Sequence, residues 1–191
     1  MMMSTPNREP TTQARETSIP LLVALLRRDT IPALTFTDPW GSLVAAGAKR
    51  IETRSWSTTY RGPLAIHIAK TLPSGAEALC YEDPFCRALE AAGYTWTFGA
   101  LHNAWNLPLG CVVAVTWLEK VECITPDFDV GEPERTYGNY APGRFAWHFS
   151  QVFRLQKPLP ARGALGIWQW TPPGCLWAEV QARLDAERQE M

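Results

Sequence analysis

The sequence predicts an α+β domain: a small mixed β-barrel of five to six strands, with helices inserted between the strands and a C-terminal helix. Three observations point to this class. Several short apolar segments have the alternation or the length of buried strands. Helix-start and helix-stop residues lie between those segments. The chain also has 16 prolines in 191 residues, and a proline inside a helix costs about 3 kcal/mol, which argues against a helical bundle.

Composition limits the classes of protein to consider. A hydrophobic content of 46% allows a sizeable core, and the net charge of -1 excludes a uniformly basic nucleic-acid coat but not a local basic patch. The apolar run from Ile19 to Leu26 is far shorter than the roughly 20 residues that cross a bilayer. The five cysteines contain no CxxC pair. We therefore expect a cytoplasmic protein with reduced thiols, no membrane segment, no metal site and no cofactor.

The two ends of the chain are expected to lie outside the barrel. Residues 1–18 are polar and mix both charges, which is typical of a disordered tail. Residues 19–30 pass from an apolar run into arginines and predict an N-terminal helical extension. Residues 172–191 carry an amphipathic pattern that predicts a C-terminal helix. The barrel domain is thus expected over residues 31–171.

A strand over residues 33–37 and a short helix directly after it open the expected domain. Asp38 is suited to cap the helix, because its carboxylate accepts backbone N–H groups, and Pro39 fits a first helical position. Apolar residues follow at helical spacing. Gly47 can adopt the left-handed conformation that ends a helix. The sequence therefore predicts a helix between Pro39 and Gly47.

The same signals predict the remaining elements. Alternating or continuous apolar runs bounded by turn residues predict strands. A helical pattern over residues 74–93 is interrupted at Pro84, where Asp83 can start a second segment. Loops are expected in one segment that is rich in tryptophan, asparagine and glycine and in another that is rich in acidic residues. The expected strands cover residues 49–54, 64–69, 111–118, 145–155 and 167–170, and the expected loops cover residues 94–109 and 119–134.

Basic residues and aromatic rings interleave in two blocks of the sequence. Residues 40–70 hold five basic side chains and one acid, and residues 135–171 hold five basic side chains and no acid. Cations bind phosphates and rings stack on unpaired bases, so this pattern favours nucleic acid. In the alternative interpretation the rings belong to the core and the charges form a solvated face.

The most specific segment runs through residues 38–56. After the helix that ends at Gly47, a strand carries Lys49, Glu52 and Arg54. Side chains two positions apart on a strand share a face, so Arg50, Glu52 and Arg54 are expected together. A carboxylate between arginines favours a charge-assisted pair. The pair has two interpretations, a structural ion pair that lines a cleft or part of a reactive site.

This segment resembles the ASCH domain, the module shared with the activating signal cointegrator 1, in the PUA-like superfamily. The resemblance covers roughly residues 31–171, with strand-like segments at Leu109–Val115, Pro142–Trp147 and Gly166–Trp170 that are similar to the family's later strands. The family pattern is met by Pro39, Trp40, Leu43 or Val44, Gly47, Lys49, Glu52, Arg54, Trp56, Gly62 and His67.

The resemblance implies a PUA-like β-barrel with a cleft between the barrel and the helix after the first strand. Family members are proposed to bind RNA or other nucleic acid there, and some small relatives are amidohydrolases of acetylated cytidine or ribonucleases. Lys49 matches a lysine of the amidohydrolases, whereas Glu52 stands where they have threonine. Glu119 is the nearest candidate for their downstream glutamate. If the protein is an enzyme, the expected catalytic residues are Lys49, Glu52 and Glu119.

Three functional classes follow from these observations. The first is a module that binds RNA or single-stranded nucleic acid in a basic cleft, the second is the enzyme just described, and the third is a protein-interaction domain with a surface in segments 94–109 and 168–177. For Trp40 and Trp56, core packing and base stacking are both open, and His67 is either a ligand contact or a hydrogen-bonded structural residue. The expected nucleic-acid contacts are Trp40, Lys49, Arg50, Arg54, Trp56, Arg61, His67, Lys70, Tyr140 and Arg144.

Overall fold

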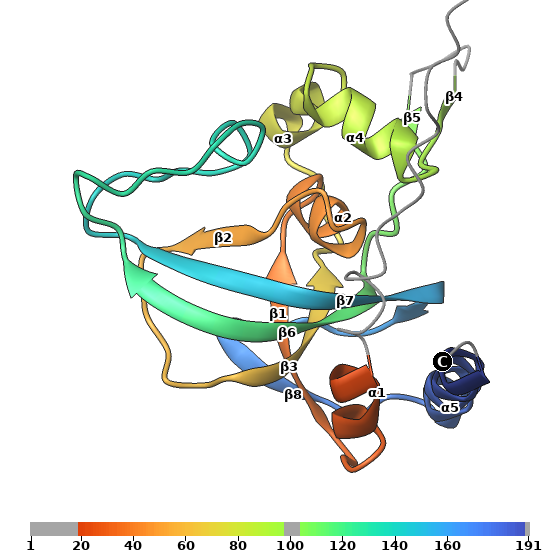
Figure 1. The fold of residues 1–191 in the computed structure, drawn as a ribbon. Helices are drawn as coiled ribbons and strands as arrows, with labels where there is room; N and C mark the ends of the chain where they lie inside the picture. The colour runs from red at the N-terminus through yellow and green to blue at the C-terminus, as the bar shows by residue number, and fades with distance from the viewer. Residues whose placement is uncertain (1–18, 98–103, 190–191) are drawn as a thin grey trace, which may run out of the picture.

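The computed structural model describes residues 19–97 and 104–189. Their fold is mixed α+β, built on one six-stranded sheet with helices around it (Figure 1). The predicted tail, residues 1–18, lies outside the described residues, as do residues 98–103 of the predicted loop at 94–109.

The sheet has the strand order β2-β7-β6-β3-β1-β8. The pairing of β1 with β3 is parallel, and every other neighbouring pair in this sheet is antiparallel. The longest ladder joins β6 to β7. The strands are β1 (Ile31–Phe36), β2 (Ile51–Arg54), β3 (Gly62–Ile68), β6 (Cys111–Cys123), β7 (Phe145–Pro160) and β8 (Ile167–Trp170).

The strand pairing leaves the sheet open, so the barrel expected from the sequence is not confirmed. The two edge strands, β2 and β8, are four residues long each and do not pair with one another. The pairing of β1 with β8 ends at Leu34. Just beyond it, Arg54 of β2 donates a hydrogen bond from Nη2 to the Thr35 carbonyl at 2.9 Å. A side chain therefore links the β2 edge to the end of β1, without a strand ladder between these two strands.

Five helices and a small two-stranded sheet complete the described fold. Helix α1 and the C-terminal helix α5 lie near each other on one side of the sheet, and α2 lies on the other side, below α3 and α4 (Figure 1). The break predicted at Pro84 is confirmed, because α3 ends before it and α4 begins after it. The elements are α1 (Ile19–Leu25), α2 (Trp40–Ala45), α3 (Ser74–Leu79), α4 (Phe85–Ala91), α5 (Gly174–Gln189), β4 (Trp96–Thr97) and β5 (Ala104–Trp105).

The stop signal predicted for α2 is confirmed, but its start differs from the prediction: the N-cap residue is Pro39, which makes no side-chain cap, and Asp38 lies one residue before it. The carboxylate of Asp38 accepts hydrogen bonds from the backbone N–H and the hydroxyl of Ser42, both at 2.9 Å. Gly47 has φ of 74°, a conformation that glycine adopts without steric cost. Because these signals are local, they fix where the chain leaves β1 and enters β2, the two strands beside the candidate site.

Two strands are longer than the sequence predicts. Strand β6 continues through Cys123, into the segment expected to be a loop at 119–134, and β7 continues to Pro160. Their ladder pairs Cys123 with Phe145 at one end and Cys111 with Pro160 at the other. Pairing with a neighbouring strand therefore carries these residues into the sheet despite their polar composition.

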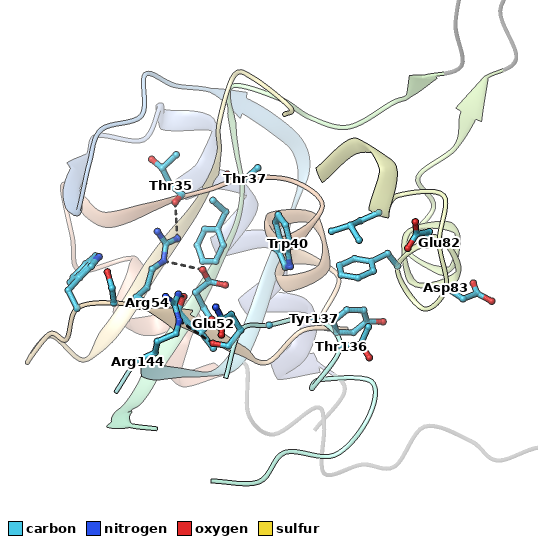
Figure 2. A pocket seen from close by; sticks show the side chains of 18 residues that line it. Thr35, Thr37, Trp40, Glu52, Arg54, Glu82, Asp83, Thr136, Tyr137 and Arg144 are labelled. Carbon is cyan, nitrogen blue, oxygen red and sulfur yellow. Dashed lines mark hydrogen bonds and ion pairs between the residues drawn. The ribbon is translucent and has the colours of Figure 1, made fainter. Parts of the chain in front are cut away.

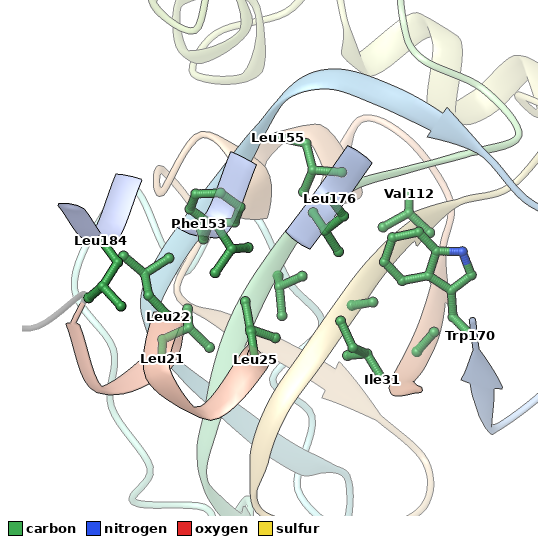
Figure 3. Packing of buried hydrophobic residues seen from close by; sticks show 14 residues of the cluster. Leu21, Leu22, Leu25, Ile31, Val112, Phe153, Leu155, Trp170, Leu176 and Leu184 are labelled. Carbon is green, nitrogen blue, oxygen red and sulfur yellow. The ribbon is translucent and has the colours of Figure 1, made fainter. Parts of the chain in front are cut away.

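The core lies on both faces of the sheet. On one face α1 and α5 bury leucines against β1, β3, β6 and β7 (Figure 3). On the other face α2 packs over a second cluster that includes Phe36, Leu64 and the fully buried Trp147. A third cluster joins α2, α3 and α4 to Tyr137. The second and third clusters support the walls of the candidate site.

Candidate functional site

The first of two adjoining cavities has a volume of about 670 Å³ and lies between β1, β2, the start of α4 and residues 136–139. Its charged groups are separated. Figure 2 shows Arg54 and Arg144 beside Glu52 at one end, and Glu82 and Asp83 at the other. The indole rings of Trp40 and Trp56 also line it, and both residues are half-buried.

The second cavity has a volume of about 1170 Å³ and shares Arg54 and residues 35–37 with the first. Its other walls are the end of β3, residues 109–111 and the connection from β7 to β8. The titratable and cationic side chains that line it, apart from Cys111, are Arg54, His67, Lys70 and Arg162, and no carboxylate lines it. The basic part of the site is thus the second cavity, and the first has mixed charge.

Lys49 lies behind the first cavity and lines neither of the two. Its side chain is 1% exposed. The ammonium donates to the Ile51 carbonyl and lies 3.5 Å from Glu134 Oε1 and 3.9 Å from Glu52 Oε2. Burial lowers the pKa of Lys49, and the two carboxylates offset part of that effect. The ammonium is enclosed by its own partners, so a ligand in the first cavity would meet Glu52 before Lys49.

Glu134 is the acid that sequence reasoning missed. Its carboxylate accepts the backbone N–H groups of Arg50 at 2.7 Å and Ile51 at 3.1 Å, and the Tyr140 hydroxyl at 3.0 Å. It lies in the acidic 119–134 segment, which was expected to be a surface loop. Glu119, the expected downstream glutamate, is exposed on β6 and lines neither cavity.

The pair predicted between Glu52 and Arg54 is present. Arg54 Nε lies 3.0 Å from Glu52 Oε1, and the guanidinium stands 5.2 Å from the centre of the Phe36 ring. Burial raises the pKa of Glu52, while Arg54, Lys49 and Arg144 act in the opposite direction. Glu52 is 14% exposed and lines the first cavity, so its carboxylate is both held in an ion pair and accessible.

The other predicted contacts divide between the cavities and the rest of the surface. Arg144 lines the first cavity and donates to the carbonyls of Thr53 at 3.0 Å and Asn139 at 3.1 Å. Arg61 donates to carbonyls of its own loop, and Arg50 donates from Nε to the Gly47 carbonyl. Neither of these two arginines lines a cavity, and neither does Tyr140.

A family model, the ASCH domain, matches residues 34–159, which is more than half of the chain. The protein belongs to the ASCH domain family. The match includes the second half of β1, the whole of α2, β2, β3 and β6, and nearly all of β7, and therefore most of both cavities. A comparison of the sequence with curated proteins gave no match.

Trp40 and Trp56, the two tryptophans of this ASCH domain's motif, each pack against another aromatic ring and also line the first cavity. Trp40 meets Phe85 edge to face at 6.2 Å, and Trp56 meets Trp147 edge to face at 4.7 Å. Since both also line the first cavity, core packing and contact with a ligand are compatible for each ring.

His67 of the ASCH motif lies on the wall of the second cavity and is 2% exposed. Its Nε2 donates to the Ala161 carbonyl at 3.1 Å, and its Nδ1 lies 3.2 Å from Thr35 Oγ1. Burial lowers the pKa of His67, and the bond to Ala161 acts in the opposite direction. The structure therefore shows the hydrogen bonds of a structural histidine at a position beside the cavity, with Lys70 exposed at the rim.

Among residues 19–97 and 104–189, no three His, Cys, Asp or Glu side chains are grouped to hold a metal ion. In the same ranges, no helix has the length and apolar character that a bilayer crossing requires.

Proposed function

We propose that this ASCH domain binds RNA or another single-stranded nucleic acid along its two adjoining cavities. One observation carries the proposal: a cavity with three permanent cations and no lining carboxylate adjoins a cavity lined by two tryptophans. Cations bind phosphate oxygens, and aromatic faces stack on unpaired bases. The ASCH family's general association with nucleic acid supports the same assignment.

The arrangement favours a single strand over a duplex. Bases must be unstacked to reach Trp40 and Trp56, because both rings are half-buried beside a recess. In the same cavity, the guanidinium of Arg54 is fixed by Glu52, Thr35 and the Phe36 ring, so little rotamer entropy remains to be lost on binding. The net charge of -1 fits focused binding in the site rather than general attraction to polyanions.

Fluorescence anisotropy with a labelled single-stranded RNA of about ten nucleotides, hydroxyl-ended, tests the proposal. Binding is expected at low salt and should weaken as salt rises. Arg144→Ala removes a cation that lines the first cavity and should weaken binding about tenfold, whereas Arg61→Ala, on a loop outside both cavities, serves as the matched control. Absence of binding at low salt, or equal effects of the two variants, would contradict the proposal.

A second candidate function is hydrolysis of a modified nucleoside or of RNA. It is favoured by Glu52, a carboxylate that lines the first cavity and whose pKa is raised by burial, as a general acid or base requires. Acetylated cytidine and a labelled RNA would be incubated with the protein and with Glu52→Gln. Turnover that Glu52→Gln abolishes supports this function, and intact substrates with the unaltered protein rule it out.

A further inference from the structure

The second cavity is bounded on one side by the connection between β7 and β8, residues 161–166, which we term the rim loop. Lys70 and residues 109–111 form another part of its lining, and Gly110 bonds the first residue of the rim loop. Arg162, in the rim loop, and Lys70 are both exposed, while Arg54 forms the boundary with the first cavity. Three cations thus line this cavity, and they come from three different segments of the chain.

The rim loop is tied to the strands beneath it. Ala161 donates its N–H to the Gly110 carbonyl at 3.0 Å and accepts from His67 Nε2 at 3.1 Å. The Thr35 hydroxyl donates to the Ala164 carbonyl at 3.1 Å. The residues on either side of Arg162 are therefore held in place, and its guanidinium is presented from an ordered backbone.

Gly163 allows this close approach. A Cβ at residue 163 would lie 2.7 Å from His67 Nδ1 and 2.8 Å from Thr35 Oγ1, both too close for ordinary contact. The rim loop therefore rests directly on the His67 ring. Trp168 contacts the same two residues, since its Nε1 donates to Thr35 Oγ1 at 3.2 Å and its ring meets His67 edge to face.

The side chains that line the second cavity carry positive charge that no lining carboxylate balances. His67 Nε2 faces a carbonyl and so carries the ring proton of the neutral imidazole. That leaves Arg54, Lys70 and Arg162 as the cations, and Glu52 offsets only Arg54, from the side of the first cavity. Three cations facing one space match a group that carries more than one negative charge better than a single phosphodiester.

We propose that the second cavity binds the terminal phosphate monoester of a single-stranded nucleic acid, an inference that rests on the proposed function. A phosphate monoester carries about -1.5 to -2 charge at neutral pH and three acceptor oxygens, which arginine binds in a bidentate geometry. A volume of about 1170 Å³ accommodates a nucleotide with its phosphate. Because both cavities share Arg54 and residues 35–37, the base of the same strand end reaches the tryptophans. Leu165, 99% exposed on the rim loop, offers apolar contact to the sugar.

Three internally labelled RNAs of identical sequence test this site: one with a 5′-phosphate, one with a 3′-phosphate and one with hydroxyls at both ends. One phosphorylated RNA is expected to bind about tenfold more tightly than the hydroxyl-ended RNA, and which one it is identifies the end that is recognised. In Lys70→Ala/Arg162→Ala this advantage should disappear, so that the phosphorylated and hydroxyl-ended RNAs bind with equal affinity, while all three RNAs bind more weakly because both cations also line the proposed RNA site. An advantage that the double variant retains would contradict the terminal-phosphate site.

The control double variant Lys157→Ala/Arg183→Ala removes two exposed cations that line neither cavity and should keep the advantage. If the double variant unfolds, the single variant Arg162→Ala is tested with the same three RNAs, and the advantage of the phosphorylated RNA should decrease. Equal affinity for all three RNAs overturns the terminal-phosphate site alone. Failure of all three to bind overturns the proposed function itself.

Discussion

The carboxylate of Glu134 lies 3.5 Å from the ammonium of Lys49 and fastens the acidic segment after β6 to the entrance of β2. The same carboxylate accepts two backbone N–H groups at that entrance. This contact orders the connection between β6 and β7 next to the first cavity, which residues 136–139 help to line. Lys49, Glu52 and Glu134, which we term the Lys49 cluster, therefore position a wall of the site.

Glu134→Gln keeps the acceptor oxygen but removes the negative charge beside Lys49. We expect the free energy of unfolding to fall by about 2 kcal/mol, because a charged hydrogen-bond partner is lost from a buried lysine. Urea denaturation measures this. Glu119→Gln, an exposed carboxylate on β6, is the matched control and should change stability by less than about 0.5 kcal/mol. Equal stabilities of the two variants would show that the Lys49 cluster does not depend on Glu134.

The raised pKa of Asp38 should make the free energy of unfolding depend on pH. Burial raises the pKa of Asp38 to about 6 from 3.8, so between these values the folded protein holds a proton that the unfolded chain has released. The free energy of unfolding therefore falls as pH rises through this window, by an amount on the order of 3 kcal/mol from this residue.

Asp38→Asn tests this dependence, because the amide can still accept from the Ser42 N–H and can donate to the Ser42 hydroxyl. The stability of the unaltered protein minus that of the variant is expected to decrease between about pH 4 and pH 6. Denaturation curves at several pH values give this difference directly, and contributions from other groups cancel in it. A difference that stays constant across the window would mean that Asp38 does not titrate in it.

Gly163→Ala should disturb the rim loop. The added methyl group meets His67 and Thr35, and relieving such overpacking costs about 1–3 kcal/mol. If the second cavity binds a terminal phosphate, the variant should also reduce the preference for phosphorylated RNA, since Arg162 is displaced. Gly131→Ala meets nothing within 4 Å and serves as the control for both measurements. Unchanged stability of Gly163→Ala would show that the loop does not rest on His67.

Leu184→Ala tests our proposal that α5 folds together with the ASCH domain, although it lies beyond the matched residues 34–159. Leu184 is 2% exposed and packs in the cluster shared by α1, α5 and the sheet. We expect a loss of about 3 kcal/mol, as for other buried leucines. Leu165→Ala, at a fully exposed leucine, should cost less than about 0.5 kcal/mol. A similar small cost for both would identify α5 as an appendage.

Short-range signals in the sequence predicted much of the fold. Strand β8 coincides with the expected residues 167–170, and the Gly47 stop and the break at Pro84 appear where they were expected, whereas α2 is capped by Pro39 and not by Asp38. These features depend on the conformational limits of proline and glycine and on hydrogen bonds over a few residues, so the chain encodes them locally. The pair of Glu52 and Arg54 was predictable for the same reason, since strand alternation places them together.

Tertiary structure decided which of the predicted residues share a site. The long ladder between β6 and β7 brings Glu134 to Lys49, and the return of the chain after β7 brings Arg162 to the same cavity as Lys70. The sequence determined that cations and rings are present in the two blocks. Whether an arginine lines a cavity, as Arg144 does, or bonds its own loop, as Arg61 does, depends on contacts between distant segments. Local propensity carries no information about such contacts, because burial and strand pairing are settled only when the whole chain packs.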